Sequence, residues 1–370
     1  MTRMMPAVRY TSPDVLAWER RHLFAGMWTC LGRLEELLGP DVTQRAVAVG
    51  DVPVLLVRDG STVRSFANTC RHRGHELLPD GETSGRASVL CPYHAWTYRL
   101  DGSLQAAPGF RESPDFAGGE HGLVELPVEV WQGWVFGHAR AALGDTSVPS
   151  FADHVGALEG IVAPYDVAAL VLGDRHSYEV AANWKVIAEN YHECYHCPLI
   201  HPELCQVSPP TSGDNYHGLP GQWVGGSMEL RDGMATMSLT GESGGHPIPG
   251  VPPERVEYVH LLPNLLISAH PDYVMTHRLV PLSPDRTWIE CSWYLQPGPD
   301  GEAPDASWAT EFWDLTNKQD WGACESVQRG LASPHFVPGP FAPNEDAVAA
   351  FVELVQAAYD TGEVTAPVTG

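Results

Sequence analysis

The chain has 370 residues, of which 44% are hydrophobic and 18% are charged, and this predicts a folded protein with room for two domains. Its formal net charge of -24 disfavours negatively charged partners such as nucleic acids and anionic membranes. The sequence shows neither a membrane-spanning apolar stretch nor a signal-peptide core. We therefore expect a cytoplasmic protein whose 8 cysteines do not form a disulfide framework.

The first part of the chain predicts a helical segment followed by a small β domain. Apolar residues recur at helical spacing over residues 13–27. Short runs rich in β-forming residues, separated by turn signals, follow at residues 54–57, 63–66, 96–100 and 131–137. We expect residues 1–45 to form a lead-in that packs on the later domain, and residues 46–145 to form the β domain. The turn-rich residues 141–149 are the expected linker.

The rest of the chain, residues 146–370, predicts a second domain of mixed type. A helix is expected to begin near Trp184, and two long helices are expected at residues 307–330 and 344–359. Runs rich in β-forming residues predict strands at residues 177–181, 260–270, 273–280 and 288–295. The whole chain is therefore expected to be α+β.

Two short segments of the β domain each combine one cysteine with one histidine. The first is Cys70-x-His72 and the second is Cys91-Pro-x-His94. A Rieske centre needs this donor set, because one iron of its [2Fe-2S] cluster keeps two Cys and the other takes two His. A Cys₂His₂ zinc knuckle uses the same donors and is the alternative, although zinc fingers favour like pairs. His75 lies outside the pair spacing, and we expect it to have a hydrogen-bonding or surface role.

The segment from His192 to His201 concentrates histidines and acids. His192-Glu193-x-x-His196 spells the H-E-x-x-H signature of zinc hydrolases. Against that interpretation, Pro198 interrupts the helix directly after His196, and a hydrolase has no use for the cysteine–histidine pairs. A structural cluster of core histidines is a further alternative. We favour a two-His, one-carboxylate iron site with His196 and His201, which leaves positions open for dioxygen and substrate.

The third ligand of such a site must come from elsewhere in the chain. In the predicted helix at residues 307–330, a stripe at spacings of four and three runs through Trp313, Asn317, Asp320, Cys324 and Val327. A carboxylate on this stripe is costly to bury without a cation, so Asp320 is the candidate. Spacing alone leaves open that Asp320 is only an exposed helix acid, as Asp314 or Glu325 is expected to be.

Both constellations together resemble the α subunits of Rieske non-haem iron oxygenases, the aromatic-ring-hydroxylating dioxygenase family, over nearly the whole chain. The resemblance is carried by C-x-H-R-G, C-P-Y-H-x-W-x-Y, N-W-K-x-x-x-E-N-Y, E-x-x-H with a later His-Pro, and the stretch from Asp320 to Gly330. It implies a Rieske β-sandwich domain beside a helix-grip catalytic domain with an antiparallel sheet and long C-terminal helices, assembled as a homotrimer. It implies a [2Fe-2S] cluster held by Cys70, His72, Cys91 and His94, and a mononuclear Fe(II) held by His196, His201 and Asp320.

Two further residues receive catalytic roles from this resemblance, Glu193 and Asn190. In the family, the carboxylate three positions before the first iron His hydrogen-bonds a cluster His and an iron His across a subunit boundary, and it carries the electron. Many members have Asp there. Glu at this position resembles the branch of glycine betaine, carnitine and choline monooxygenases. One departure is the gap between His72 and Cys91, which is a residue longer than in many members.

The implied activity is oxygenation with O₂ as co-substrate and hydroxylation or oxidative N-demethylation of a small organic substrate, such as a quaternary or N-methylated amine. No Gly-rich dinucleotide fingerprint follows any strand, so electrons from NAD(P)H must arrive through a separate flavin or ferredoxin-type reductase. Ring hydroxylation of an aromatic compound, and a Rieske electron carrier with a scaffold domain, are the alternatives. Aromatic faces for a cation, or plain core, are expected at Tyr191, Tyr195, Trp223, Tyr258 and Trp293.

Overall fold

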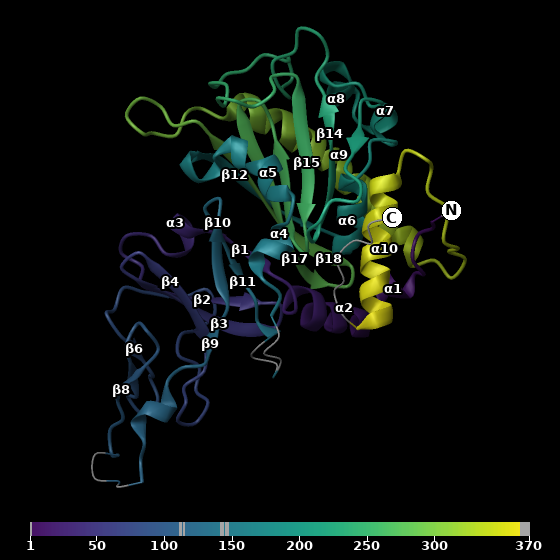
Figure 1. Ribbon diagram of the computed structural model, residues 1–370. Coiled ribbons are helices and arrows are strands. Elements are labelled where there is room, and N and C mark those ends of the chain that lie inside the picture. Colours follow the sequence, from purple (N-terminus) through teal and green to yellow (C-terminus); the bar gives the residue numbers. More distant parts are fainter. Residues whose placement is uncertain (1, 111–112, 114, 141–143, 145–147, 363–370) are drawn as a thin grey trace. The chain divides into compact units, whose positions relative to one another are not determined.

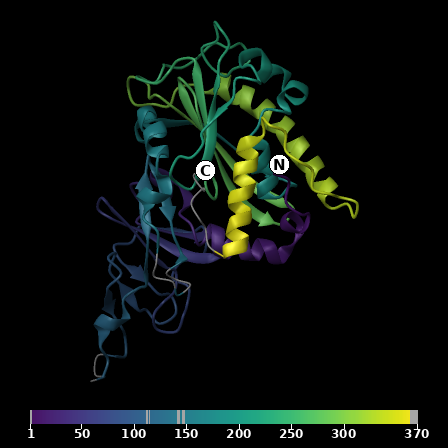
Figure 2. The same cartoon turned by 45° about the vertical axis from the view of Figure 1, so that its right-hand side comes forward.

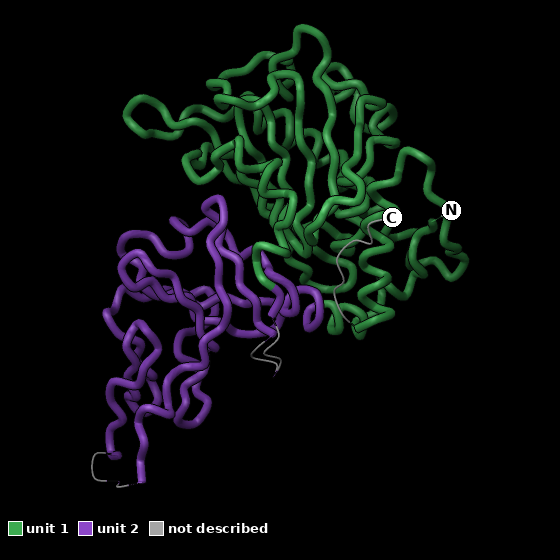
Figure 3. The backbone as a smooth tube through the Cα atoms, viewed as in Figure 1, with its two compact units in different colours: residues 1–19, 150–370 green, residues 20–149 purple. Residues whose placement is uncertain are grey.

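The structure is a computed structural model that describes residues 2–110, 113, 115–140, 144 and 148–362. It divides into two compact units, which Figure 3 shows in different colours. Unit 1 consists of Met1–Glu19 and Ser150–Gly370, and unit 2 consists of Arg20–Pro149. In sequence, unit 2 is therefore an insertion into unit 1.

The first boundary between the units lies after Glu19, whereas the sequence predicts it after residue 45. The reason is backbone pairing, because β1 (Thr29–Arg33) joins β11 (Trp134–Gly137) in an antiparallel ladder. Leu31 and Leu37 also lie in the buried core of unit 2. A short apolar strand does not reveal its partner strand by composition. The expected linker, residues 141–149, lies largely outside the described residues.

Unit 2 contains three antiparallel sheets in its described residues (Figure 1). The five-stranded sheet has the order β5-β2-β3-β4-β9, and the three-stranded sheets have the orders β1-β11-β10 and β6-β7-β8. The remaining strands are β2 (Gln44–Val49), β3 (Val52–Asp59), β4 (Thr62–Ala67), β5 (Thr83–Ser84), β6 (Val89–Leu90), β7 (Thr97–Tyr98), β8 (Leu104–Ala106), β9 (Glu125–Leu126) and β10 (Val128–Trp131). The helices are the π-helix η1 (Arg20–Phe24), α3 (Leu34–Leu37) and the 3-10 helix η2 (Gly118–His121). One core cluster of this unit encloses Cys70 and Cys91 together with Trp96 and Tyr98.

Unit 1 is organised around a seven-stranded antiparallel sheet with the order β12-β18-β17-β16-β15-β14-β13. Its strands are β12 (Val171–Val180), β13 (Asp214–Asn215), β14 (Trp223–Glu229), β15 (Arg255–Leu261), β16 (Leu265–Ala269), β17 (Tyr273–Ser283) and β18 (Arg286–Leu295). The run predicted as one strand at residues 260–270 is a hairpin, because the chain turns between Leu261 and Leu265. Pro263, inside this turn, has no N–H to give to a ladder.

The helices of unit 1 include two long ones near the C-terminus, α9 (Ser307–Leu331) and α10 (Asp346–Thr361). The shorter ones are α1 (Val8–Thr11), α2 (Pro13–Glu19), α4 (Phe151–Val155), α5 (Leu158–Val162), η4 (Ala163–Tyr165), η5 (Val167–Ala169), α6 (Trp184–Tyr191), α7 (Cys197–Ile200) and α8 (Pro202–Val207). Helix α6 contacts β17, and α9 and α10 both contact α6 (Figures 1 and 2). The predicted α+β class, antiparallel sheet and long C-terminal helices are confirmed. No helix among the described residues has both the length and the apolar character needed to cross a membrane.

The predicted stripe on α9 is largely buried. Trp313, Asn317 and Cys324 are buried, but Val327 is 41% exposed and the buried face continues through Gln328 instead. Each turn has 3.6 residues, so a stripe with a seven-residue repeat drifts around the helix by about 20° per heptad.

The N-terminal segment is tied into unit 1 through buried polar contacts. The Lys185 ammonium lies 2.5 Å from a carboxylate oxygen of Glu19, and both side chains are fully buried. Trp184 Nε1 donates to the second Glu19 oxygen at 2.8 Å, and the Tyr359 hydroxyl donates to the first. Burial lowers the pKa of Lys185, and the Glu19 charge counteracts this effect. A buried charge is tolerated only with such partners, so Glu19 holds the first nineteen residues on α6.

Candidate metal centres

The two cysteine–histidine segments of unit 2 form loops with the same backbone pattern. In the first loop, Cys70 N donates to the carbonyl five residues later at 2.8 Å, and Gly74 N donates back to the Cys70 carbonyl at 3.0 Å. In the second loop, Cys91 N and Ala95 N make the equivalent bonds at 2.8 and 3.1 Å. Gly74 and Ala95 both have left-handed φ values, +70° and +58°. The two loops therefore present their side chains in equivalent ways.

The donors of these loops are arranged with sulfur inside and imidazole outside. Cys70 and Cys91 are each 2% exposed, and the His72 and His94 rings lie at partly exposed positions with centroids 4.8 Å apart. Burial, followed by the neighbouring Cys70, raises the pKa of Cys91. His94 Nδ1 is buried and makes no hydrogen bond among the described residues. An orphaned imidazole nitrogen beside two converging thiols fits a cluster with two Cys and two His ligands. His75 is exposed and bonds the Glu76 carbonyl, so it stands apart from the four donors.

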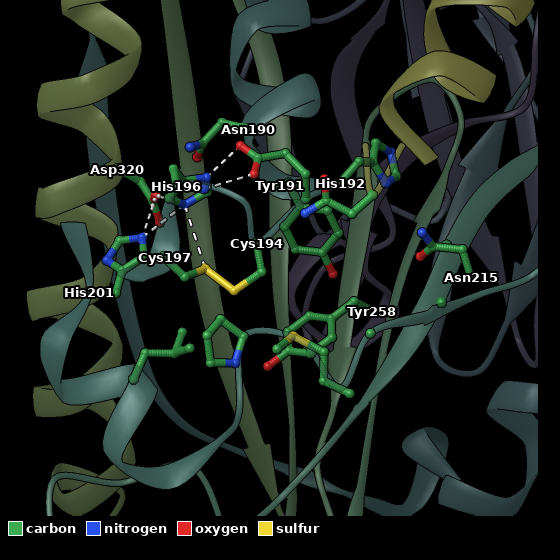
Figure 4. Close-up of a pocket in the computed structure, with 18 of the residues that line it drawn as sticks. Asn190, Tyr191, His192, Cys194, His196, Cys197, His201, Asn215, Tyr258 and Asp320 are labelled. Carbon is green, nitrogen blue, oxygen red and sulfur yellow. Dashed lines mark hydrogen bonds and ion pairs between the residues drawn. A yellow bond between two sulfur atoms is a disulfide. The ribbon is translucent and has the colours of Figure 1, made fainter. Parts of the chain in front are cut away.

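In unit 1, three donor atoms converge from two segments that are far apart in sequence (Figure 4). His196 precedes α7, His201 follows it, and Asp320 projects from α9. His201 Nε2 lies 2.8 Å from Asp320 Oδ1, and His196 Nε2 lies 3.3 Å from the same oxygen. The two Nε2 atoms are 3.1 Å apart. The structure thus brings together the three residues that the sequence proposes as iron ligands.

Hydrogen bonds at the Nδ1 atoms of the two imidazoles orient the rings so that each Nε2 faces Asp320. His196 Nδ1 lies 2.5 Å from Glu193 Oε1, and His201 Nδ1 lies 2.7 Å from Gln319 Oε1. Both partners are acceptors, so each Nδ1 carries the hydrogen and each Nε2 presents a lone pair. With both imidazoles neutral, two lone pairs and a carboxylate oxygen then face one another, an arrangement that a proton or a metal cation between them stabilises. Holding a histidine through its second nitrogen is the usual support for a metal ligand.

The three donor atoms are close enough together to bind one metal ion. Their separations are 2.8, 3.1 and 3.3 Å. Two imidazoles and one carboxylate are the donor set of many non-haem iron sites. The residues therefore fit a two-His, one-carboxylate iron site.

The electrostatics of this site favour positive charge. Burial by itself lowers the pKa of His196, but hydrogen bonds to Asp320 and Glu193 outweigh burial and raise this pKa to about 9. Burial opposes ionisation of Asp320 as well, yet the hydrogen bonds from the two imidazoles hold its pKa below the usual range. Two carboxylates thus surround two imidazoles, and a divalent metal satisfies the same demand as a proton.

The H-E-x-x-H alternative is excluded by the position of His192. Helix α6 ends at Tyr191, so His192 and His196 do not share a helix face. His192 Nε2 lies 3.4 Å from His260 Nδ1, and the two rings stack with centroids 5.5 Å apart. Burial holds the pKa of His192 well below its usual value. His192 is therefore a neutral core residue.

A disulfide between Cys194 and Cys197 lies beside the three donors, which the sequence analysis does not anticipate. Cys197 Sγ is 3.9 Å from His196 Nε2. As half of a disulfide, Cys197 has no thiolate to offer, so Asp320 remains the third donor. Only tertiary contact reveals this bond, because a C-x-x-C spacing equally suits two free thiols or a metal site.

A cavity of about 450 Å³ opens at the three donors, within the range of small-molecule sites. Glu193 and Asn190 line it, as do Tyr191, Tyr258, Trp313 and Trp321. Among the residues expected to offer aromatic faces, only Tyr191 and Tyr258 line this cavity. Trp223 and Trp293 are buried elsewhere and Tyr195 is 62% exposed, since neighbours on a loop or strand point in different directions.

Two features of the site escape sequence analysis. Gln319 holds His201, and its position directly before Asp320 in the chain is the one signal that could have indicated it. The far side of the cavity is formed by Asn215 on β13 and by Asp346 at the start of α10, which a 2.5 Å hydrogen bond joins. Neither belongs to a motif, because the two segments meet only through folding.

Comparisons with known proteins agree with both centres. Residues 27–124 match the Rieske [2Fe-2S] domain, and residues 167–361 match the ring hydroxylating alpha subunit (catalytic domain). The glycine betaine monooxygenase oxygenase subunit of Chromohalobacter salexigens is 30% identical over 91% of this chain and 81% of its own length. The carnitine monooxygenase oxygenase subunit of Acinetobacter baumannii is 37% identical over 53% of this chain and 52% of its own length.

Solved structures give the same relationship. The crystal structure of a quaternary ammonium Rieske monooxygenase in complex with L-carnitine superimposes with a TM-score of 0.73 at 25% identity, covering 96% of this chain and 95% of that one. The resemblance inferred from the motifs is therefore confirmed, and with it a Rieske cluster, a catalytic non-haem iron and a reductase partner. The chain belongs to the ring-hydroxylating α subunits of the Rieske non-haem iron oxygenases and is related to the glycine betaine and carnitine monooxygenases.

Proposed function

We propose that this chain is the oxygenase component that oxidises an N-methyl group of a small methylated amine. The observation that carries the proposal is the convergence of His196, His201 and Asp320 at the wall of a cavity that also offers aromatic faces. The relatives named above act on quaternary amines, which supports the same class of substrate here. The ligands are proposed to be those three residues for the iron, and Cys70, His72, Cys91 and His94 for the cluster.

The iron, when bound, supplies open coordination positions at which dioxygen is activated. The chain's own residues orient this chemistry. Glu193 and Gln319 hold the hydrogens on the Nδ1 atoms of His196 and His201, so that each Nε2 lone pair points at one place. Tyr191 is anchored through its hydroxyl to the Ile267 carbonyl at 2.8 Å, which leaves its ring available for a cationic nitrogen.

The stoichiometry of N-methyl oxidation follows from the balance of atoms and electrons. One oxygen atom enters the methyl C–H bond, and the other leaves as water after uptake of two electrons and two protons. The N-hydroxymethyl product then loses formaldehyde and a proton and leaves a demethylated amine. Electrons are proposed to come from NAD(P)H through a flavin or ferredoxin-type reductase, and this need supports a cytoplasmic location.

Glu193 is proposed to connect the two centres across a subunit boundary of a homotrimer. Its Oε1 already accepts from His196 Nδ1, and its Oε2 accepts from the backbone N–H groups of Tyr195 and His196. This carboxylate is therefore fixed in place next to one ligand histidine. Asn190, which also lines the cavity, is proposed as a second catalytic residue of the same region.

The test is reconstitution with a surrogate reductase and a panel of methylated amines and aromatic compounds. We expect oxygen uptake that depends on the amine, with formaldehyde formed in a one-to-one ratio. The protein should also show a Rieske EPR signal and about one further iron per chain. Cis-diol formation from an aromatic compound, without turnover of any amine, would instead favour ring hydroxylation.

A further inference from the structure

The cavity of unit 1 is lined by several acidic side chains. Its acidic lining residues are Glu193, Asp214, Asp320 and Asp346. Within the described part of unit 1, no lysine or arginine lines the cavity. Residues 363–370, which the structure does not describe, contain neither residue type in their sequence. Asp346 also lies 3.1 Å from Nε2 of His217, which lines the cavity as well.

The nearby basic residues of unit 1 are occupied by acids. Arg255 Nε lies 2.8 Å from Glu257, and the Arg255 guanidinium also donates to the Tyr216 hydroxyl. Arg278 lies 3.2 Å from Glu290. Lys185 is bound to Glu19 in the interior. These cations are therefore paired with protein carboxylates, and none of the three lines the cavity. Arg255 also interacts electrostatically with the cavity acid Asp214.

The acidic residues lie at both ends of the cavity. Figure 4 shows His196, His201 and Asp320 at one end, Asn215 at the other, and Tyr191 and Tyr258 between them. Asp346 adjoins Asn215 through their hydrogen bond, and Asp214 precedes Asn215 in the chain. An N-methyl group placed for oxidation directs the rest of the substrate towards these far acids. A substrate carboxylate there would meet like charges, and the nearby imidazole of His217 is already held by Asp346 at 3.1 Å.

Binding of the substrate carboxylate to the iron would not give a productive complex. A substrate that bound the metal through its carboxylate would turn its methylammonium end away from the oxidising position. Tyr258 also presents a buried hydroxyl with no hydrogen-bond partner among the described residues. A neutral polar group on the substrate, such as an alcohol, ester or amide oxygen, can accept from it without adding negative charge.

We propose that the substrate is a net-cationic methylated amine without a carboxylate, in contrast to zwitterions such as glycine betaine and carnitine. This proposal rests on the proposed function and specifies its substrate class. The substrate is selected by total charge, because the aromatic rings accept a quaternary nitrogen equally in the cationic and zwitterionic forms. The acids at the far end then discriminate between the two forms.

The experiment is anaerobic calorimetric titration of the iron-loaded holoenzyme with two matched pairs. The pairs are choline with glycine betaine, and L-carnitine methyl ester with L-carnitine. We expect the cation of each pair to bind about tenfold more tightly or better, the effect of one like charge at roughly 5 Å in a partly solvated cavity. The neutral isostere 3,3-dimethyl-1-butanol should bind more weakly than choline.

A matched variant pair assigns the discrimination to the far end. Asp346→Asn keeps the size and hydrogen-bonding capacity of the side chain, and it should narrow the choline-to-betaine ratio about threefold. Asp214→Asn should act in the same direction. The control, Asp360→Asn, changes an exposed acid on the same helix that does not line the cavity, and it should leave the ratio unchanged.

The outcomes separate this proposal from the proposed function. Equal or tighter binding of glycine betaine and carnitine overturns the charge selection, and oxygen uptake with formaldehyde release on these zwitterions would leave N-methyl oxidation intact. Binding of the neutral isostere as tight as that of choline also overturns it. If no methylated amine binds or is turned over, both proposals are wrong.

Discussion

The two candidate metal centres of this chain are assembled in opposite ways. In unit 2, four donors come from two loops of one backbone pattern that are close in sequence, and the sulfurs are buried while the imidazoles are partly exposed. In unit 1, two histidines flank the short helix α7 and the carboxylate comes from α9, more than a hundred residues later. The first centre depends on loop geometry, and the second depends on the packing of distant elements.

This difference indicates how each centre should respond to change. The donors of a loop centre are fixed by backbone conformation. Such a centre is therefore expected to be sensitive to substitution of the donors themselves and of the residues with left-handed φ values. A packed centre has its donors fixed by side-chain hydrogen bonds, so its sensitivity extends to the residues that hold the imidazoles. Substitutions at each centre therefore test whether the two centres respond in these different ways.

The largest effect is expected for Asp320→Ala. It removes the one donor that α9 contributes, so iron should be lost from unit 1 and turnover should fall about a thousandfold or more, beyond the ten- to hundredfold typical of supporting residues. Iron analysis and oxygen uptake measure this. Glu311→Ala, at an exposed position of the same helix, is the control and should retain both. A Rieske signal lost together with the iron would contradict the independence of the centres.

His72→Ala should produce the converse result. The cluster loses one of four ligands, so the Rieske EPR signal should disappear and turnover should fall to the level without reductase, while the mononuclear iron remains. His75→Ala, on the same loop but outside the donor set, should keep the signal. Persistence of the cluster in His72→Ala would mean that another side chain serves as the ligand.

Gln319→Leu tests the support of the packed centre. The substitution removes the acceptor that holds His201 Nδ1 and keeps a similar volume, so iron affinity should fall ten- to hundredfold with the cluster unchanged. Competition with a chelator measures the affinity. An unchanged affinity would show that His201 is oriented by backbone alone, which would make this centre resemble the loop centre.

The smallest effects are expected at the left-handed loop residues of unit 2. Gly74→Ala should destabilise the cluster loop by about 1–2 kcal/mol, because a Cβ there meets no atom within 4 Å and the cost is that of the backbone conformation alone. Ala95→Gly should relieve the same strain and shift stability in the opposite direction by about 1 kcal/mol. Thermal loss of the visible cluster absorbance reports both, and equal effects of the same sign would contradict the equivalence of the loops.

The extent to which sequence predicts each centre follows from the same contrast. The sequence proposes Cys70, His72, Cys91 and His94 as cluster ligands because their spacing within short loops is itself the geometry. It proposes His196 and His201 as iron ligands for the same reason. Asp320 was not separable from its neighbours by spacing, and only the resemblance to a family singled it out. Gln319, Asp346 and the Cys194–Cys197 bond required folding to bring them to the site.

The boundary between the two units was also difficult to predict, because it depends on contacts between segments that are distant in sequence. The sequence correctly indicated a β domain and a mixed domain with long C-terminal helices. It misplaced residues 20–45, because β1 pairs with a strand about a hundred residues later, and strand composition does not encode its partner. The sequence did not indicate that the buried side chains of the N-terminal segment contact α6. The apolar pattern of a helix predicts that one face is buried, but it does not predict which element covers that face.

The contact of Glu19 with Lys185 and Tyr359 has a consequence for biosynthesis. Residues 2–19 are synthesised before unit 2, yet the groups that they bind are made only after the whole of unit 2. Domains fold as units during synthesis, so unit 2 is expected to complete its core before α10, which carries Tyr359, has been made. Until Lys185 has been synthesised, the Glu19 carboxylate lacks the ammonium group that it binds in the folded protein.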